Sequence, residues 1–307
     1  MYVPMKTILD HATANHYAVI AASGIDMVMM RALVSAADEK KAPLIIIMGG
    51  LQMAKMANPE LLVPIIQKLA GETASPIALC LDHGRDFNKV AYAVRNGFSS
   101  VMIDASTKPI QENIALTQKV VELCHPLAIS VEGELGHVGI AANLDGCDES
   151  MYTQPKEAAF FARMTGVDCL AIAVGTAHGK YPPGFIPKIS FDRIRSVKEA
   201  TYNMPIALHG SSGSGDDNII RAVDAGVNKI NVATDLLNAC KMGIQRALTG
   251  NPDLDYLTLL QHAELSCKKL LKHWIDLSGS SGKSAGFMPN YDIKRLQCDF
   301  ASDMIGE

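Results

Sequence analysis

The sequence lacks the features that mark several common classes of protein. No apolar run approaches the ~20 residues that a membrane-spanning helix needs. The first residues, MYVPMKTILDHATANHYAV, interrupt their apolar run with His and Asn, which is not the pattern of a secretory signal peptide. Basic and acidic residues are nearly balanced, 28 against 32, for a formal net charge of -4. This balance gives no electrostatic reason to expect a nucleic-acid or anionic-membrane partner.

The spacing of the cysteines does not indicate disulfide pairs either. The seven cysteines are scattered, their number is odd, and no CxxC occurs. Cys80 and Cys169 lie in apolar runs, where a buried free thiol is the ordinary interpretation. These observations favour a reducing, cytoplasmic location.

No Pro/Gly/Ser linker divides the chain into comparable halves, and apolar runs alternate with helical patterns along it. Most of the runs are continuous, as in parallel strands that are covered on both faces. The G-x-G-x-x-G fingerprint of a dinucleotide fold does not follow the first run. Eight units, each of one apolar run and one helical pattern, predict a single-domain α/β protein. The expected fold is a (β/α)8 TIM barrel over residues 1–285, with a tail at 286–307. The eight runs are 17–23, 42–49, 76–82, 100–105, 128–135, 169–174, 205–210 and 229–234.

Three of the nine histidines follow predicted strands, where a barrel of this kind has its active site. They are His83, His178 and His209, after the third, sixth and seventh strands. Three neutral imidazoles with one open position describe a catalytic zinc site. Taken singly, each could be a hydrogen-bonded histidine at the barrel rim, but the three together favour a metal. The role of His137 stays open, between a group that supports the site and one that contacts substrate.

Carboxylates follow the same strands. Asp82 precedes the first histidine and is a candidate general acid or base. Asp104 and Glu134 could orient histidines, and Glu134 could also bind the metal. For Glu132 we expect only hydrogen bonds to loops at the rim.

A Gly/Ser-rich turn, HGSSGSG (209–215), lies between the seventh strand and a helical pattern. Backbone N–H groups at such a helix start bind phosphate well, and barrels often hold phosphate after strands seven and eight. Asn231 and Thr234 would add side-chain donors there. The loop at 137–155 is long for its position, which is typical of a functional lid.

These motifs together resemble the class II fructose-bisphosphate aldolase family, which includes the tagatose-bisphosphate aldolases. Each motif alone is modest, whereas the ordered set is highly specific and spans roughly residues 1–285. The matching segments are LDHG (81–84), SVMIDAS (100–106), SVEGELGHVG (130–139), AVGTAHGKY (173–181), ALHGSSG (207–213), KINVATDL (229–236) and SGSSGKS (278–284).

The resemblance implies a zinc-dependent aldolase that cleaves a phosphorylated ketose to dihydroxyacetone phosphate and an aldehyde, and that forms a homodimer or homotetramer. It implies His83, His178 and His209 as zinc ligands and Asp82 as proton donor to the aldehyde oxygen in condensation. Glu134 and Asp104 match the family's further acidic positions at the metal. The donor phosphate would be held by Gly179, Gly210, Ser211, Ser212, Asn231 and Thr234. Carbonyls near Ala177, Gly179, Gly210 and Ser212 would hold a monovalent cation.

Departures from the family pattern concern the aldehyde half of the site. Gly49 stands where fructose-bisphosphate enzymes have a serine for the distal phosphate, and Ala233 replaces an acidic or amide residue. The lid reads GIAANLDGCDES, where Asp145, Asp148 and Glu149 are equal candidates for the family's lid acid. The metal and donor-phosphate half keeps its residues.

Two other functions remain open at this stage: a different metal-dependent barrel enzyme, such as a hydrolase, and a non-catalytic metal-binding barrel. The first predicted strand ends in AAS rather than the H-x-H of amidohydrolase-type barrels. The clearest strand ends carry no lysine, because Lys180 lies beyond the sixth strand and Lys229 begins the eighth. A metal is therefore favoured over a lysine Schiff base.

Overall fold

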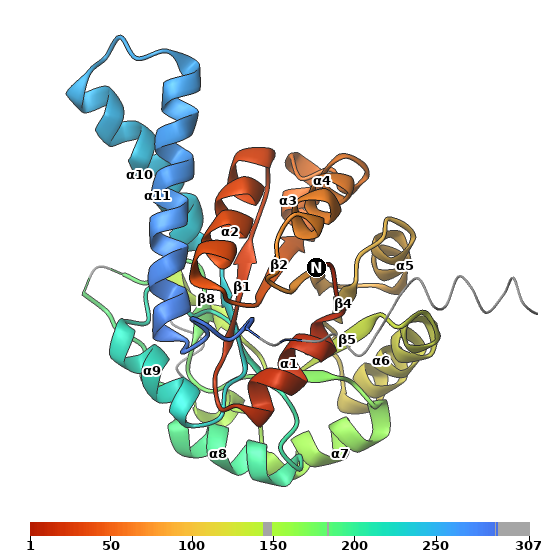
Figure 1. The fold of residues 1–307 in the computed structure, drawn as a ribbon. Helices are drawn as coiled ribbons and strands as arrows, with labels where there is room; N and C mark the ends of the chain where they lie inside the picture. The colour runs from red at the N-terminus through yellow and green to blue at the C-terminus, as the bar shows by residue number, and fades with distance from the viewer. Residues whose placement is uncertain (144–148, 183, 286, 288–307) are drawn as a thin grey trace, which may run out of the picture.

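The computed structural model describes residues 1–143, 149–182, 184–285 and 287. Eight parallel strands in this part of the chain close into a barrel in the order β1-β10-β9-β7-β5-β4-β3-β2 (Figure 1). The predicted TIM barrel is confirmed, and each predicted strand corresponds to one observed strand. The strands are β1 (Val19–Ser23), β2 (Leu44–Gly49), β3 (Ile77–Gly84), β4 (Ser100–Ile103), β5 (Ser130–Leu135), β7 (Cys169–Ile172), β9 (Ile206–Leu208) and β10 (Lys229–Val232).

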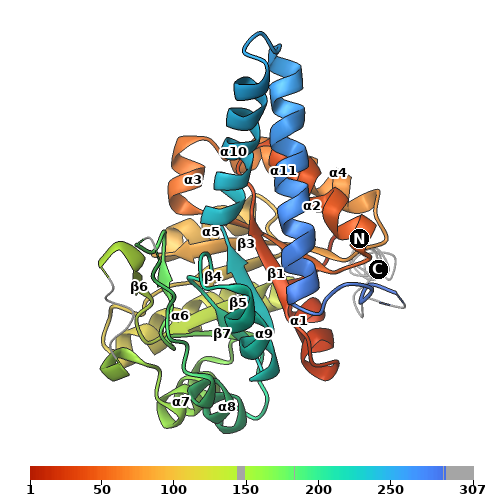
Figure 2. The same ribbon diagram turned by 90° about the vertical axis from the view of Figure 1, so that its left-hand side faces the viewer.

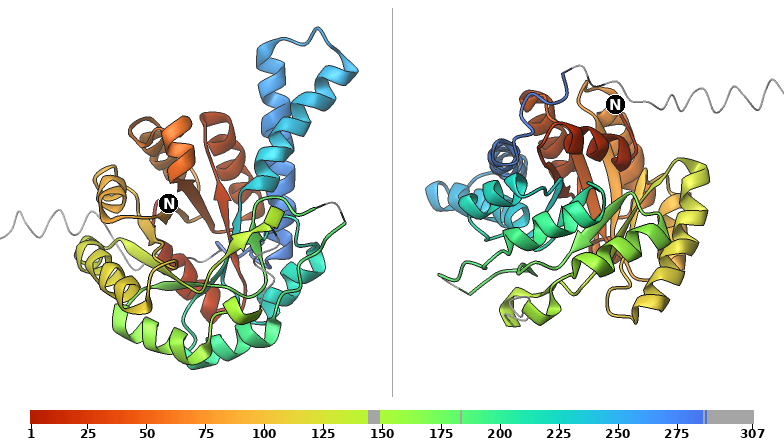
Figure 3. Two further views of the ribbon diagram at one scale, coloured as in Figure 1. Left: turned by 180° about the vertical axis from the view of Figure 1, so that it is seen from behind. Right: turned by 90° about the horizontal axis from the view of Figure 1, so that it is seen from below.

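Helices surround the barrel and cover the outer faces of the strands (Figures 1 and 3). Several begin at a carboxylate that accepts a backbone N–H, as Asp26 does at α2 and Asp86 at α5. The α-helices are α1 (Met5–Ala14), α2 (Met27–Lys40), α3 (Gly50–Lys55), α4 (Pro59–Gly71), α5 (Phe87–Arg95), α6 (Ile110–Cys124), α7 (Pro155–Thr165), α8 (Phe191–Ala200), α9 (Asp216–Asp224), α10 (Thr234–Gly250) and α11 (Tyr256–Leu277). Short 3₁₀ turns are η1 (His125–Leu127), η2 (Ala141–Asn143) and η4 (Glu149–Met151).

The core has two layers because successive side chains of a strand point to opposite faces. On β1, Ile20 and Ala22 belong to the outer layer against the helices, while Val19 and Ala21 belong to the layer inside the barrel. Both faces of each strand are therefore buried, which explains the continuous apolar runs of the sequence.

Helix α1 covers the end of the barrel at which the strands begin. Its first residues bind the first residues of two strands, since the backbone N–H groups of Met5 and Lys6 donate to the hydroxyls of Ser100 and Ser130. Phe287 is buried against this inner layer. The rest of the predicted tail lies outside the described residues.

A hairpin of α10 and α11 projects from the barrel as an arm (Figures 1 and 2). Helix α11 packs against α10 and, nearer the barrel, against α2. Large apolar side chains are exposed on the arm, including Tyr256, Leu257 and Leu265. Among the described residues no helix combines the length and the apolar character that crossing a membrane requires.

Candidate active site

The three predicted histidines meet at the end of the barrel where the strands finish. His83 is near the end of β3, His178 is in the short strand β8 (Ala177–His178), and His209 directly follows β9. The ring centroid of His83 lies 4.8 Å from those of both His178 and His209, and the latter two are 5.7 Å apart. One nitrogen from each ring falls within 4.8 Å of the others. Tertiary folding thus brings together residues that are separated by up to 126 positions.

The backbone of β3 is distorted where it presents His83. The pairing register between β3 and β4 shifts between Leu81 and Gly84. His83 adopts a φ of 49°, in the left-handed region that a residue with a Cβ seldom occupies. Gly84 is required beside it, because a Cβ there would lie 2.6 Å from the carbonyl oxygen of Met102. The strand end therefore holds His83 in a conformation that costs free energy, as is common at functional sites.

The arrangement of ring nitrogens fits a metal ion. The Nε2 atom of His178 is buried and finds no hydrogen-bond partner within the part of the chain that the structure describes. Nε2 of His83 and Nδ1 of His209 are 3.0 Å apart. Burial, followed by the neighbouring His83 and His209, lowers the pKa of His178 to about 3, so this imidazole stays neutral as a metal ligand must. A buried nitrogen without a partner is costly unless something binds it.

Asp104 and Glu134 lie beside Nδ1 of the His83 ring, on the other side of the ring from Nε2. Oδ2 of Asp104 is 2.8 Å from Nδ1 of His83, and Oε2 of Glu134 is 3.7 Å from the same nitrogen. Asp104 is itself fixed by the hydroxyl of Ser106. Burial, together with the charge of Asp104, raises the pKa of Glu134 to about 8. Asp104 is thus placed to orient His83, and Glu134 is a buried acid whose Oε2 has no hydrogen-bond partner among the described residues.

Glu132 has a different position from the one expected. Instead of binding loops at the rim, its side chain lies fully buried inside the barrel, with Oε1 2.8 Å from Nε2 of His209. Its other oxygen is 2.8 Å from Nζ of Lys229, which is also buried. The register explains this placement, since Glu132 pairs with Met102 and Cys169, two members of the inner layer. Alternation along EGE in β5 was the only sequence signal that could have indicated it.

Asp82 is held next to the histidines through Asn231. The amide Nδ2 of Asn231 donates to Oδ1 of Asp82 over 3.0 Å and lies 3.4 Å from Nδ1 of His209. The sequence predicts Asn231 as a phosphate donor, and that role stays a prediction; in the structure its amide binds Asp82. Its contact with Asp82 links the predicted acid–base residue to the metal-ligand cluster.

The predicted phosphate residues gather beside the cluster. Gly179 and Gly210 have φ values of +103° and +65°, and a Cβ on Gly210 would lie 2.6 Å from the backbone of Ala177. The hydroxyl of Ser211 donates to the carbonyl of Asn231, and that of Ser212 accepts the N–H of Asp235. Thr234 is the first residue of the 17-residue helix α10. Helix N-termini attract anions. Because the hydroxyls of Ser211 and Ser212 already have partners, the donors near the start of α10 are mainly backbone N–H groups.

The predicted lid begins beside His178. Strand β6 (Gly139–Ile140) pairs with β8 so that Ile140 is opposite His178. Of the three candidate lid acids, Glu149 is exposed in η4, while Asp145 and Asp148 lie outside the described residues. His137 is half-buried just before β6.

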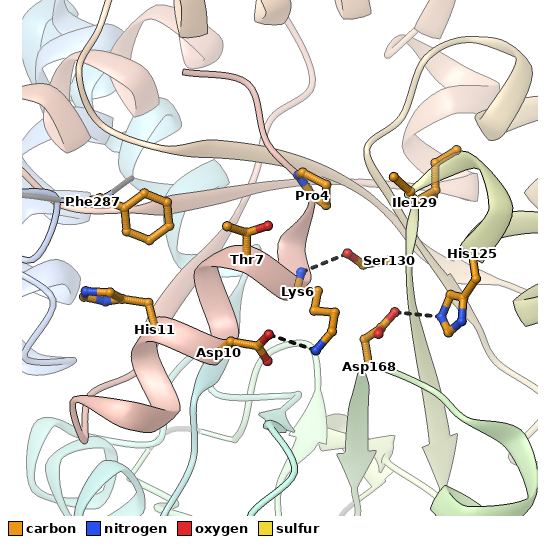
Figure 4. A pocket seen from close by; sticks show the side chains of 11 residues that line it. Pro4, Lys6, Thr7, Asp10, His11, His125, Ile129, Ser130, Asp168 and Phe287 are labelled. Atoms are coloured by element: carbon orange, nitrogen blue, oxygen red, sulfur yellow. Dashed lines mark hydrogen bonds and ion pairs between the residues drawn. The ribbon is translucent and has the colours of Figure 1, made fainter. Parts of the chain in front are cut away.

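A pocket of about 630 Å³ lies at the other end of the barrel under α1 (Figure 4). It contains none of the predicted site residues. Its charged groups pair with each other, Lys6 with Asp10 and His125 with Asp168. The chemistry described above therefore belongs to the end of the barrel that carries the histidines.

Residues 3–283 match the model of the family described as fructose-bisphosphate aldolase class-II. The chain belongs to this family. The match covers the whole barrel, including each of the strand ends that form the site, and stops just before the predicted tail.

Solved structures of aldolases are similar to this chain over most of its length. The YdjI aldolase from Escherichia coli K12 is 32% identical with a TM-score of 0.82, and the alignment covers 92% of this chain and 100% of that one. A putative fructose-1,6-biphosphate aldolase from Coccidioides immitis is 25% identical with a TM-score of 0.79, covering 92% and 97%. The fold is also shared with fructose-bisphosphate aldolase from Campylobacter jejuni, at 21% identity, a TM-score of 0.78 and coverage of 92% and 96%.

Proposed function

We propose that the protein is a zinc-dependent aldolase that reversibly cleaves a phosphorylated ketose, a ketose 1,6-bisphosphate or related ketose 1-phosphate, to dihydroxyacetone phosphate and an aldehyde. One observation carries the proposal: three imidazoles converge directly beside an anchored carboxylate, and one of them has a buried nitrogen without a hydrogen-bond partner among the described residues. This arrangement stands in a barrel of the aldolase family.

The residues that would hold zinc are His83, His178 and His209, with Glu134 within reach as a further ligand. A bound zinc would act as a Lewis acid on the ketose oxygens and stabilise the charge that cleavage leaves on the donor fragment. Asp104 and Glu132 keep the rings of His83 and His209 in place from behind.

Asp82 would move the proton at the aldehyde oxygen. In cleavage it takes the proton of the hydroxyl group as the carbon–carbon bond breaks, and in condensation it returns that proton. Its hydrogen bond from Asn231 keeps the carboxylate next to His209. The donor phosphate would rest at Gly179, Gly210, Ser211, Ser212, Asn231 and Thr234, with a monovalent cation on the nearby carbonyls.

The environment of Lys229 argues against a lysine Schiff base. Burial alone would lower the pKa of this lysine, but the Glu132 carboxylate outweighs burial and holds the pKa above its ordinary value. An imine requires the neutral amine as nucleophile. Lys229 is an ammonium bound to two partners, which supports metal chemistry instead.

We further propose that the arm mediates assembly into a homodimer or homotetramer. The proposal is supported by exposed apolar side chains on a hairpin that projects from the barrel, at Tyr256, Leu257 and Leu265. Sedimentation of the protein and of a Leu257→Glu/Leu265→Glu variant would test it. A monomeric wild-type protein would contradict the proposal.

The test of the activity follows exchange of a carbon-bound proton of dihydroxyacetone phosphate with deuterated water by NMR, which needs no knowledge of the aldehyde. We expect exchange in the zinc-loaded protein, its loss with a chelator and its return with added zinc. Zinc bound to folded protein without exchange would favour the two alternatives, another metal-dependent barrel enzyme or a non-catalytic metal-binding barrel.

A further inference from the structure

A chain of buried polar contacts crosses the inside of the barrel beneath the histidines. It runs from Nε2 of His209 to Glu132 over 2.8 Å, and from Glu132 to Nζ of Lys229 over 2.8 Å. Nζ of Lys229 then donates to Oδ1 of Asn231 over 2.6 Å, and Nδ2 of Asn231 donates to Oδ1 of Asp82 over 3.0 Å. Lys229 is the middle of this chain.

The position of Lys229 follows from the strand register. It opens β10 opposite Val19 of β1 and Ala207 of β9, and both of these belong to the inner layer. Its side chain is therefore inside the barrel, where it is 1% exposed. An ammonium is almost never buried to this degree unless it is paired, so Glu132 and Asn231 together make the burial tolerable.

The chemistry of an ammonium decides how the Asn231 amide is turned. An amide offers an oxygen that accepts and an NH₂ that donates, and the two ends have nearly the same shape. Lysine only donates, so Lys229 requires the oxygen of Asn231 on its side. The NH₂ group must then face Asp82, which as a carboxylate only accepts. With Lys229 absent, the oxygen of the Asn231 amide would lose its donor, and only the Asp82 carboxylate would still favour this orientation.

We propose that Lys229 is a positioning residue, which anchors the oxygen of the Asn231 amide and thereby holds Asp82 beside the metal-ligand cluster. This inference rests on the role of Asp82 in the proposed function. Lys229 itself touches no substrate. Its effect on Asp82 passes through Asn231. Glu132 is its counter-ion, and His209 lies at the far end of the chain of contacts.

The experiment must separate this role from simple neutralisation of Glu132. Lys229→Met leaves a buried, unpaired carboxylate and is expected to destabilise the fold. The informative variant is Glu132→Gln/Lys229→Met, which removes both charges, keeps an acceptor for His209 and leaves Asn231 without its ammonium. If Lys229 acted only as a counter-ion, this double variant would keep the Asn231 amide as it is in the wild-type protein, and any loss through His209 would affect both half-reactions equally.

The first readout needs no metal and no activity. In metal-free, ¹⁵N-labelled protein, the side-chain NH₂ protons of Asn231 should exchange slowly with solvent, and Asn231→Ala identifies their signals. In the double variant we expect their exchange to be at least tenfold faster, because the amide has lost the contact that anchors its oxygen. Unchanged exchange would overturn the proposal.

The second readout separates the two half-reactions in the zinc-loaded protein. We expect the double variant to cleave ketose phosphate roughly 10- to 100-fold more slowly, as for a misplaced catalytic group. Proton exchange on dihydroxyacetone phosphate, which does not use the aldehyde oxygen, should fall less than cleavage does, because it needs only the support that Glu132→Gln weakens at His209. Wild-type cleavage, or an equal loss of both reactions, would overturn the proposal. If the wild-type protein shows neither reaction, the proposed function fails, and the amide readout still decides whether Lys229 anchors Asn231.

Discussion

Oδ2 of Asp104 lies 2.8 Å from Nδ1 of His83, and this contact leaves the opposite nitrogen of the ring facing His209. A carboxylate bound behind a histidine fixes both the tautomer and the orientation of the ring. The same relation recurs between Glu132 and His209. Two of the three candidate ligands are thus oriented by carboxylates, while His178 presents a buried nitrogen.

Asp104→Ala should weaken zinc binding 10- to 100-fold, because His83 loses the group that orients it. Competition with a chromophoric chelator would measure the dissociation constant. Glu112→Gln is a matched control, since Glu112 is an exposed carboxylate on the outside of α6. Equal zinc affinity of the Asp104→Ala and control variants would remove Asp104 from the metal centre.

His178→Ala should abolish zinc retention and activity together, because it removes one of three neutral ligands. Elemental analysis of the dialysed protein and the dihydroxyacetone phosphate exchange assay would measure the two losses. His125→Ala is the control, as His125 pairs with Asp168 at the far end of the barrel. A variant that kept zinc and full activity would refute the ligand assignment.

Asp82→Ala should keep its zinc but lose cleavage activity, on the order of 10²–10⁴-fold for a lost acid–base group. The comparison is between zinc content and the rate of ketose phosphate cleavage in the same preparation. A cleavage rate like that of the wild type would exclude Asp82 from the mechanism.

Gly210→Ala should destabilise the protein by about 1–3 kcal/mol, the usual cost of a strained backbone position. The added Cβ meets the backbone of Ala177 at 2.6 Å, next to His178, and φ at Gly210 is +65°. Zinc affinity should fall with stability, because β8 must move. Gly250→Ala, at the open end of α10, serves as control and should be neutral or slightly stabilising. Chemical denaturation would compare the two, and equal midpoints would contradict the prediction.

Much of the fold and part of the candidate site could be predicted from the sequence. The apolar runs indicate buried parallel strands, and their ends place His83, His178 and His209 on one face from the sequence alone. The donor loop after β9 was located in the same way, because active-site residues of such barrels follow the strands. The contact of the Ser211 hydroxyl with the carbonyl of Asn231 could not be predicted, because it depends on how β9 and β10 lie side by side.

The sequence by itself determined which residues alternate along each strand and which of them end at the catalytic face. Only the tertiary structure decided which inward side chains meet across the barrel, because that depends on the stagger of closed strands rather than on local pattern. Glu132 and Lys229 are 97 positions apart in the chain, yet their charged groups are 2.8 Å apart. The strained φ of His83 and the pairing of β6 with β8 were likewise decided by packing between distant segments. The period-two pattern of a strand predicts whether a side chain lies inside or outside the barrel. Which side chain it contacts there is determined only when the barrel closes.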